Sequence, residues 1–340
     1  MQKKAGIITL YASQNYGAFL QGYSMQTTLK KRGYNVEFIK YADLDIHEFI
    51  FMIKTKNMKL AAFRVRQYFK YCTSRKLLNV AKKKYNGEKK DLVVIGSDTL
   101  WDVQNPTIKD SYYFLGFDIN SDIILAYAPS ANGTSPREFK EHYTRKGLFS
   151  NFNAIAVRDQ HTADMVYEIT GTMPQVVLDP TLLLDSSEYP IEKNIKENDY
   201  VLVYGYSFSE KERQIIQQYA TKNHLKTVSI GLLNSWCDKN IAATVEEFLG
   251  YVSKAHCIFT STFHGTIFSI IFQKQFVTFA RNNYKVLDLL EKLELLDRNA
   301  SKTLDNCEGL ADDSINYSVV NEKIRKFREC ANLYLIKNSK

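Results

Sequence analysis

The stretch AGIITLYASQNYGAFLQGYSMQTTLKKRGYNVEFIK, residues 5–40, contains the pattern that decides the fold. It opens with a short run rich in β-branched residues, which is typical of a buried strand. A segment with apolar residues on one helical face follows and ends at Gly33, a residue type that commonly terminates helices. A second strand-like run, Tyr34–Lys40, completes the pattern. A strand–helix–strand unit of this kind predicts a right-handed crossover between two parallel strands.

The same alternation of strand-like and helix-like segments continues along the chain. In the N-terminal half the further expected strands are residues 91–98, 123–133, 154–159 and 175–180. The polar stretch DSSEYPIEKNIKEND, residues 185–199, is typical of a linker. Beyond it the expected strands are residues 200–207, 225–231, 257–263 and 275–280. This organisation predicts two α/β domains, each built on a parallel sheet, with a cleft between them.

The expected domain boundaries follow from these segments. We expect an N-terminal Rossmann-like domain at 1–190 with a basic helical insertion at about 50–90, a C-terminal Rossmann-like domain at 198–315, and a C-terminal helix at 316–340. The length of 340 residues supports two domains, because single cores rarely exceed about 250–300 residues. The five cysteines are widely spread and form no C-x-x-C pair, so neither a disulfide framework nor a zinc ribbon is expected. With no signal-peptide pattern and no long apolar run, a cytoplasmic location is expected.

Positive charge is concentrated in one segment. Between Lys54 and Lys90 there are 13 lysines and arginines against one glutamate, although the whole chain carries only +8. Apolar residues are interleaved with these charges. Such a segment can make peripheral contact with the anionic inner face of a membrane, or it can be the solvated face of inserted helices. No nucleic-acid recognition motif accompanies the charge, so nucleic acid is not expected as a partner.

The stretch TSTFHGTIFSIIFQKQFVTF, residues 260–279, places a single histidine between an expected strand and an expected helix. Backbone N–H groups at a helix start bind phosphate and carboxylate readily, and hydroxyl side chains precede His264. An imidazole in such a place can transfer protons near neutral pH. The alternative is a histidine that caps the helix or packs beside aromatic rings.

Arg158 ends the apolar run AIAV. An arginine at the carboxyl end of a buried strand needs an anionic partner, because burial of an unpaired charge is very costly. Its sequence neighbour Asp159 and a ligand phosphate are both candidates.

Two further turns at strand ends could likewise either bind a ligand or have a purely structural role. The Gly-Ser turn before Asp98 could hold a small anion by backbone amides, or Asp98 could cap a helix. In SQNYGA, residues 13–18, Ser13 or Asn15 could cap the following helix, or the glycine could allow a ligand to approach. The sequence contains no G-x-x-x-x-G-K-[ST], no G-x-G-x-x-G and no G-x-S-x-G, and its His, Cys and carboxylate residues show no metal-ligand spacing.

Six sequence segments, taken in their order along the chain, resemble the polysaccharide pyruvyl transferase family. They are YASQNYGAFLQGYSMQTTLKKRGYNVEFI, VVIGSDTLWD, AYAPSANG, AVRDQHTADMV, VVLDPTLLL and TSTFHGTIFSIIFQKQFVTF. The resemblance implies two Rossmann-like domains arranged as in the GT-B glycosyltransferases. It implies an enzyme that transfers the pyruvyl group of phosphoenolpyruvate, as co-substrate without a further cofactor or metal, to hydroxyls of a surface or exopolysaccharide precursor as a ketal. The sequence departs from the family pattern at Thr99, at Asp102 and at Gln275, where glutamine, asparagine and proline are common.

The resemblance also implies roles for individual residues. His264 matches the histidine regarded as catalytic, and we expect Asp98 to orient or deprotonate a hydroxyl. The residues expected to bind phosphoenolpyruvate are Arg158, Ser97, Thr262, Phe263, Gly265 and Thr266. The residues expected near a saccharide acceptor are Asn15, Tyr16, Gly17 and Trp101. Whether that acceptor is lipid-linked is left open.

Two other functions fit parts of the pattern. A nucleotide-sugar glycosyltransferase shares the fold class but needs a pyrophosphate site and a base-binding pocket in the C-terminal domain. A non-catalytic carbohydrate-binding protein of an envelope pathway needs neither Arg158 nor His264, and the presence of both counts against it.

Overall fold

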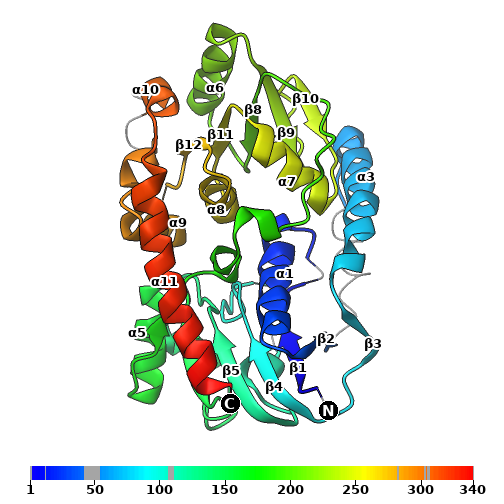
Figure 1. The fold of residues 1–340 in the computed structure, drawn as a ribbon, viewed down its shortest axis with the longest axis vertical. Coiled ribbons are helices and arrows are strands. Elements are labelled where there is room, and N and C mark those ends of the chain that lie inside the picture. The colour runs from blue at the N-terminus through cyan, green and yellow to red at the C-terminus, as the bar shows by residue number, and fades with distance from the viewer. Residues whose placement is uncertain are drawn as a thin grey trace. The chain divides into compact units, whose positions relative to one another are not determined.

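The computed structural model describes residues 2–11, 13–41, 54–105, 111–281, 283–301, 304 and 307–339. The chain forms two compact units (Figure 1). Unit 1 consists of Met1–Ile46, Lys76–Leu184 and Arg325–Lys340, and unit 2 consists of His47–Arg75 and Asp185–Ile324. Each unit is built on its own parallel sheet with helices packed against it. The predicted fold class is therefore confirmed.

The described part of unit 1 contains a sheet with the strand order β3-β2-β1-β4-β5-β6-β7. Its strands are β1 (Lys4–Ile8), β2 (Asn35–Lys40), β3 (Val80–Lys84), β4 (Lys90–Ile95), β5 (Ser121–Tyr127), β6 (Ala154–Val157) and β7 (Gln175–Val176). Strand β1 pairs in parallel with β2 on one side and with β4 on the other, and Ala5 lies opposite Val36 and Leu92. The strand order reverses between β1 and β4. In open α/β sheets such a switch point is where ligands bind, outside the carboxyl ends of the strands.

Helices cover both faces of the unit 1 sheet. Adjacent residues of a strand face opposite sides. Phe38 of β2 lies against Gly22 of helix α1 (Tyr16–Lys31), while its neighbour Ile39 belongs to the core under helix α5 (Gln160–Thr170). Helix α4 (Pro136–His142) packs beside α5. Two short 3₁₀ segments complete the unit, η2 (Tyr112–Leu115) and η3 (Pro180–Leu183), the second in contact with α1.

The C-terminal helix α11 (Tyr317–Asn338) contributes its last residues to unit 1. The Tyr334 hydroxyl donates to the Ala126 carbonyl of β5 at 3.0 Å. The Arg328 guanidinium donates to the Leu184 carbonyl at 2.7 Å. The N- and C-terminal segments of the chain therefore both belong to unit 1 (Figure 1).

The described part of unit 2 contains a sheet with the order β10-β9-β8-β11-β12. Its strands are β8 (Tyr200–Tyr204), β9 (Lys226–Ile230), β10 (Lys239–Ile241), β11 (Cys257–Thr260) and β12 (Gln275–Thr278). All neighbouring pairs are parallel, and Thr260 of β11 lies opposite Tyr204 of β8. The strand order reverses between β8 and β11, so this unit has its own switch point at that place.

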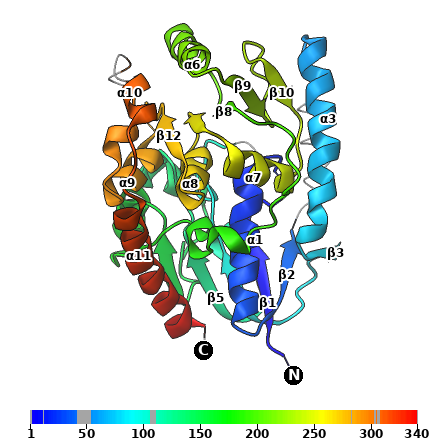
Figure 2. The same ribbon diagram turned by 45° about the horizontal axis from the view of Figure 1, so that its top comes forward.

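Helices cover both faces of this sheet as well. The helices of this unit are α3 (Met58–Ser74), α6 (Glu210–Lys222), α7 (Val245–Lys254), α8 (Phe263–Ile271), α9 (Tyr284–Lys292) and α10 (Cys307–Asp312), with 3₁₀ segments η4 (Ser186–Glu188) and η5 (Leu296–Arg298). The 3₁₀ segment η1 (Arg75–Leu77) lies where the chain passes from unit 2 back to unit 1. On one face α6 and α10 enclose a core that contains Val203 and Phe259. On the other face α7 and α8 lie side by side (Figure 2), and Phe248 of α7 packs edge-on against Phe268 of α8.

Helix α3 belongs to unit 2, although its sequence lies between strands of unit 1. The Gln67 side-chain amide exchanges two hydrogen bonds of 3.0 Å with the backbone of Ala243. Lys70 forms an ion pair of 2.9 Å with Glu247 of α7. These polar contacts hold the helix to unit 2, so residues 54–75 of the expected insertion do not belong to the N-terminal unit. Residues 76–90 do belong to unit 1, but they include strand β3 instead of being wholly helical. Residues 50–53 of the expected insertion lie outside the described residues.

No helix in the described part of the chain is both long enough and apolar enough to cross a membrane.

Candidate functional site

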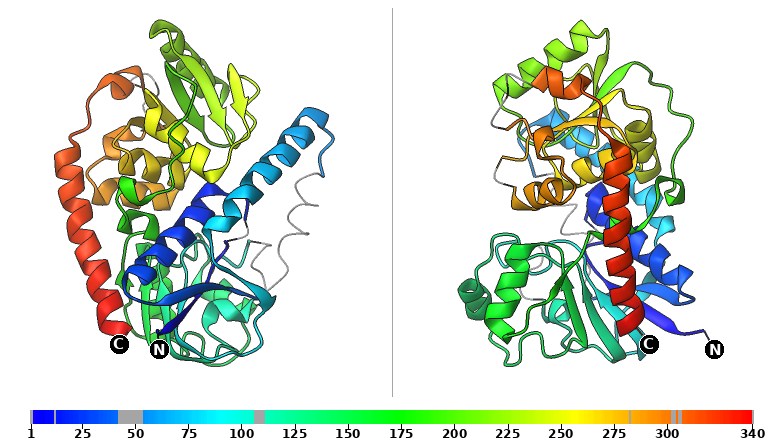
Figure 3. Two further views of the ribbon diagram at one scale, coloured as in Figure 1. Left: turned by 45° about the vertical axis from the view of Figure 1, so that its right-hand side comes forward. Right: turned by 60° about the vertical axis from the view of Figure 1, so that its left-hand side comes forward.

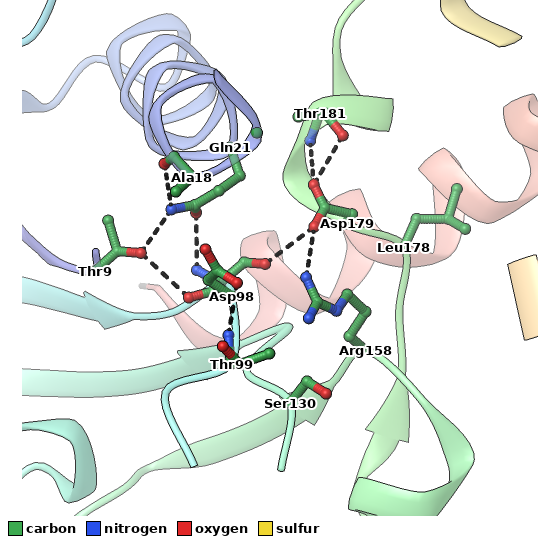
Figure 4. Close-up of polar contacts among 12 residues, drawn as sticks. Thr9, Ala18, Gln21, Asp98, Thr99, Ser130, Arg158, Leu178, Asp179 and Thr181 are labelled. Atoms are coloured by element: carbon green, nitrogen blue, oxygen red, sulfur yellow. Dashed lines mark hydrogen bonds and ion pairs between the residues drawn. The ribbon is translucent and has the colours of Figure 1, made fainter. Parts of the chain in front are cut away.

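A buried hydrogen-bond network joins α1 to the carboxyl ends of β1 and β4 at the switch point of unit 1 (Figure 4). Gln21 is fully buried at its centre. Its amide nitrogen donates to the Thr9 hydroxyl at 2.6 Å and to the Ala18 carbonyl at 2.8 Å. Its amide oxygen accepts from the Ser97 N–H at 3.1 Å, and the Thr9 hydroxyl donates to the Ser97 carbonyl at 3.2 Å. Gln21 therefore fixes the turn that follows β4.

The Asp179 carboxylate connects this turn to the end of β6 (Figure 4). Its Oδ2 accepts from the Ser97 hydroxyl at 3.2 Å and from the Arg158 guanidinium at 3.1 Å. Its Oδ1 accepts from the Thr181 N–H at 3.0 Å and from the Thr181 hydroxyl at 2.8 Å. The side chain of Asp179 is 0% exposed and that of Arg158 is 4% exposed. A buried ion pair is tolerated better when further hydrogen bonds satisfy its polar atoms, and here Ser97 and Thr181 satisfy the two oxygens of Asp179.

The structure pairs Arg158 with Asp179 rather than with its sequence neighbour Asp159, and contact with a ligand phosphate stays a prediction. Asp159 instead caps α5, where its Oδ1 accepts from the Thr162 N–H at 2.9 Å and from the Thr162 hydroxyl at 2.6 Å. Asp179 holds the planar guanidinium of Arg158 in one orientation. The carboxyl ends of β4 and β6 therefore place the hydroxyl of Ser97 and the guanidinium of Arg158 on a single carboxylate.

Asp98 follows Ser97 with a left-handed backbone, φ 78°. Its Oδ1 accepts from the Thr99 N–H at 2.8 Å, and its carbonyl accepts from the Ser130 N–H at 2.8 Å. No helix starts there among the described residues, so the expectation that Asp98 caps a helix is wrong. The Asp98 carboxylate is half-buried and lies beside the Ser97 turn (Figure 4).

Trp101 is a core residue in this structure. It is 0% exposed, its indole N–H donates to the Phe114 carbonyl at 2.9 Å, and its ring packs edge-on against Phe149 at 4.8 Å. Its expected contact with an acceptor therefore finds no support, because the whole side chain is used in packing beneath the site.

Gly96 directly follows β4 and has φ 127°, a backbone conformation that residues with a side chain rarely adopt. A Cβ atom there would lie 2.1 Å from the Tyr127 carbonyl of β5. Only glycine allows the close approach of β4 to β5 that sets the position of Ser97.

Asn15 caps α1. Its side-chain oxygen accepts from the Gly17 N–H at 2.8 Å and from the Ala18 N–H at 3.4 Å. Tyr16 and Gly17 form the buried first turn of the helix. The capping alternative for SQNYGA is therefore observed, and contact of these residues with an acceptor stays a prediction.

Hydroxyl groups fix the turn between β11 and α8 at the switch point of unit 2. The Thr260 hydroxyl donates to the Tyr204 carbonyl of β8 at 2.6 Å and accepts from the Thr262 N–H at 3.1 Å. The Ser261 hydroxyl accepts from the Tyr206 N–H and donates to the Tyr206 carbonyl, both at 3.0 Å. The ends of β8 and β11 are therefore joined side chain to backbone.

His264 is the second residue of α8, and Thr262 caps this helix through the Gly265 N–H at 2.9 Å. The histidine therefore lies inside the helix rather than between the strand and the helix, and it is not the cap. His264 is 8% exposed and its ring lies edge-on to Phe263 at 5.2 Å. Thr266 is fully buried and its hydroxyl contacts the Thr278 hydroxyl of β12 at 3.3 Å. The imidazole therefore lies in the first turn of α8, where the helix dipole favours anions.

Gly265 allows this turn to close. A Cβ atom at residue 265 would lie 2.1 Å from the Thr260 hydroxyl oxygen and 2.7 Å from that of Thr262. Because both hydroxyls are held by hydrogen bonds, neither can retreat without breaking a contact.

Helix α3 brings a further cation near this turn. Loss of hydration raises the pKa of the Tyr206 phenol, and the charge of Arg64 on α3 opposes this shift without cancelling it. Tyr206 follows β8, so Arg64 lies close to the carboxyl edge of the unit 2 sheet.

Each unit thus gathers its own share of the expected residues at its own switch point. Unit 1 joins Ser97 and Arg158, with Asp98 in the adjoining turn, and unit 2 joins Thr262 through Thr266. Sequence reasoning missed Thr9, Gln21 and Asp179. Asp179 could have been found, because it lies near the end of the expected strand 175–180, as Arg158 does in the expected strand 154–159, and carboxyl ends of parallel strands meet at one edge. The described residues contain no group of three or more His, Cys, Asp or Glu side chains placed to hold a metal ion.

Two Rossmann-like units with these strand orders define an α/β protein of the GT-B type. Similar solved structures include a UDP-N-acetylglucosamine 2-epimerase with a TM-score of 0.51, 10% sequence identity and coverage of 100% of this chain and 97% of that one. The glycotransferase of kitacinnamycin has a TM-score of 0.50, 12% identity and 99% coverage of both chains. The S. aureus MnaA–UDP structure has a TM-score of 0.50, 12% identity and coverage of 98% and 97%. At these identities the likeness shows the fold alone.

The family model of polysaccharide pyruvyl transferases matches residues 15–283, which is most of the chain. The chain therefore belongs to the polysaccharide pyruvyl transferase family, as the six sequence segments predicted. No curated protein sequence matches the chain.

Replacing Asp179 by leucine is expected to lower the free energy of unfolding by about 3–5 kcal/mol, because Arg158 would remain as an uncompensated buried charge. The double variant Arg158→Met/Asp179→Leu should recover most of that loss. Urea unfolding measures both. The matched control is Asp118→Asn, which breaks an exposed pair with Arg145 and should cost under about 1 kcal/mol. Equal losses for Asp179→Leu and Asp118→Asn would contradict the burial argument.

Substitution Gly265→Ala is expected to destabilise the protein by about 1–3 kcal/mol, because the added methyl group overlaps the Thr260 and Thr262 hydroxyls. Gly133→Ala serves as the control, since its Cβ atom would meet no atom within 4 Å. Thermal unfolding of both variants measures the difference. A Gly265→Ala protein as stable as Gly133→Ala would show that the turn is looser than described.

Proposed function

We propose that this chain transfers the pyruvyl group of phosphoenolpyruvate to two hydroxyls of a saccharide precursor of a surface polymer, as a ketal. Membership of the polysaccharide pyruvyl transferase family over residues 15–283 is the observation that carries the proposal. The positions of His264 and of Arg158, each at a switch point, support it, since such places bind anionic ligands in α/β sheets.

The reaction sets clear demands on the protein. One acceptor hydroxyl adds to C2 of phosphoenolpyruvate while its proton leaves, and C3 gains a proton to become the methyl group. The second hydroxyl then displaces phosphate at C2, and its proton leaves with the phosphate. The products are one ketal and one hydrogen phosphate, so no oxidant, reductant or further cofactor is needed.

His264 is proposed as the group that moves a proton in these steps. A histidine can both donate and accept protons near neutral pH. Its place in the first turn of α8 sets it beside the positive end of the helix dipole, which favours the phosphate and carboxylate of the donor. The hydroxyl contacts of Thr262 and Thr266 hold this turn in place.

Arg158 and Ser97 are proposed to bind a carboxylate or phosphate of the donor. Asp179 balances the charge of Arg158. Recognition of the donor would therefore depend on the direction of the Arg158 N–H groups rather than on net charge. A planar guanidinium suits the two oxygens of a carboxylate for this reason. Asp98, half-buried beside Ser97, is proposed to orient an acceptor hydroxyl.

Ligand-dependent thermal unfolding tests the donor. Phosphoenolpyruvate at about 100 times its dissociation constant should add ~2.7 kcal/mol of stability to the wild type. Arg158→Gln should lose this increment, measured against its own ligand-free baseline because the substitution also disturbs Asp179. Arg137→Gln, on an arginine whose side chain is 87% exposed, is the control and should keep it.

A panel of uridine and guanosine diphosphate sugars runs beside phosphoenolpyruvate in the same experiment. Stabilisation by a nucleotide sugar and none by phosphoenolpyruvate would move the protein to the glycosyltransferases and contradict the proposal.

A further inference from the structure

The inner face of α3 is polar and already satisfied by unit 2. Gln67, Tyr71 and Ser74 are its buried residues. The Ser74 hydroxyl hydrogen-bonds with the Glu246 carboxylate and accepts from the Val245 N–H at 2.9 Å. Together with the Gln67–Ala243 bonds, these contacts fix which side of the helix faces unit 2.

The opposite face of α3 exposes large apolar side chains. Met58 is 85% exposed and Phe69 is 62% exposed. They are about three helical turns apart, so they project from the same side of the helix. Lys59, Ala62 and Arg66 are exposed on the arc between and beside them. The left view of Figure 3 shows α3 at the outer side of unit 2. We call Met58, Lys59, Ala62, Arg66 and Phe69 the outer face of α3.

The charge of this segment has one sign. From Lys54 to Arg75 there are seven lysines and arginines and no acidic residue. Lys70 is paired with Glu247, and Arg75 lies over the Tyr68 ring at 5.9 Å. The cations of the outer face itself, Lys59 and Arg66, are exposed together with Lys54 and Lys56 just before the helix.

We propose that the outer face of α3 docks on an anionic lipid surface. An amphipathic helix with cations on its polar side and Phe or Leu on the other lies in a bilayer interface by a combination of charge attraction and apolar insertion. The cations alone would also suit a nucleic acid, but Met58 and Phe69 would then bring apolar surface against phosphates. The two apolar side chains therefore favour lipid. This docking goes beyond the transfer reaction and would hold the enzyme beside a membrane-bound acceptor.

Vesicle co-sedimentation of the full chain tests the proposal. The probes are vesicles of phosphatidylcholine with about one-third phosphatidylglycerol, and vesicles of phosphatidylcholine alone. The wild type is expected to bind the anionic vesicles and to be released at high salt. The double variant Lys59→Glu/Arg66→Glu should bind at least tenfold more weakly, because each cation near an anionic surface contributes about fivefold to partitioning. Phe69→Ser should weaken binding severalfold while leaving its salt dependence in place.

Matched controls separate this surface from general charge and from misfolding. Lys140→Glu on α4 and Tyr167→Ser on α5 change exposed residues of the same types and should leave vesicle binding unchanged. All variants should keep the wild-type thermal midpoint, since every altered side chain is exposed. Their response to phosphoenolpyruvate should also be unchanged, so a failure of this proposal is distinct from a failure of the proposed function.

Four results would overturn the proposal. Equal binding to neutral vesicles, or equal loss in the Lys140→Glu control, would remove the role of the outer face. Binding of an oligonucleotide without vesicle binding would assign the charge to nucleic acid. A dimer in sedimentation equilibrium that Phe69→Ser dissolves, again without vesicle binding, would make this face a contact between two copies of the chain.

Discussion

The arrangement at the carboxyl edge of unit 1 depends on one carboxylate. Asp179 is fully buried and accepts hydrogen bonds from Ser97, Arg158 and Thr181. Without it, the guanidinium at the end of β6 would be a buried charge lacking its counter-ion, and the turn after β4 would lose the hydroxyl contact that ties it to β6. The Gln21 network holds the same turn from the side of α1. The site is thus held in place because buried polar groups join the carboxyl ends of β1, β4 and β6.

In unit 2, hydroxyl groups rather than an ion pair hold the strand ends together. Thr260, Ser261 and Thr262 bind backbone atoms at the ends of β8 and β11 and at the start of α8. Gly265 leaves the space for these contacts, so His264 is carried on a turn with little freedom. The two units therefore present different chemistry at equivalent places: a paired guanidinium in unit 1 and an imidazole at a helix start in unit 2.

The sequence predicted what depends on local pattern. Buried runs of β-branched residues, such as those of β1 and β4, predict parallel strands. Polar residues directly after these runs then lie at the carboxyl edge of the sheet. The partners of buried groups depend on tertiary contacts and were predicted less well. Arg158 pairs with a residue from another strand end rather than with its neighbour, and the polar face of α3 binds α7 of unit 2, which charge and periodicity alone could not reveal. Trp101 was expected near an acceptor, yet its side chain is completely buried in the core.

Direct detection of the ketal tests the central claim most directly. Phosphoenolpyruvate labelled with ¹³C at C3 would be incubated with glycan precursors extracted from an envelope, and ¹³C NMR would follow the new methyl carbon while released phosphate is counted. The account predicts one phosphate for each ketal methyl group with the wild type, and neither product with His264→Gln. Unchanged phosphoenolpyruvate together with transfer of a glycosyl group from a nucleotide sugar to the same precursors would contradict it.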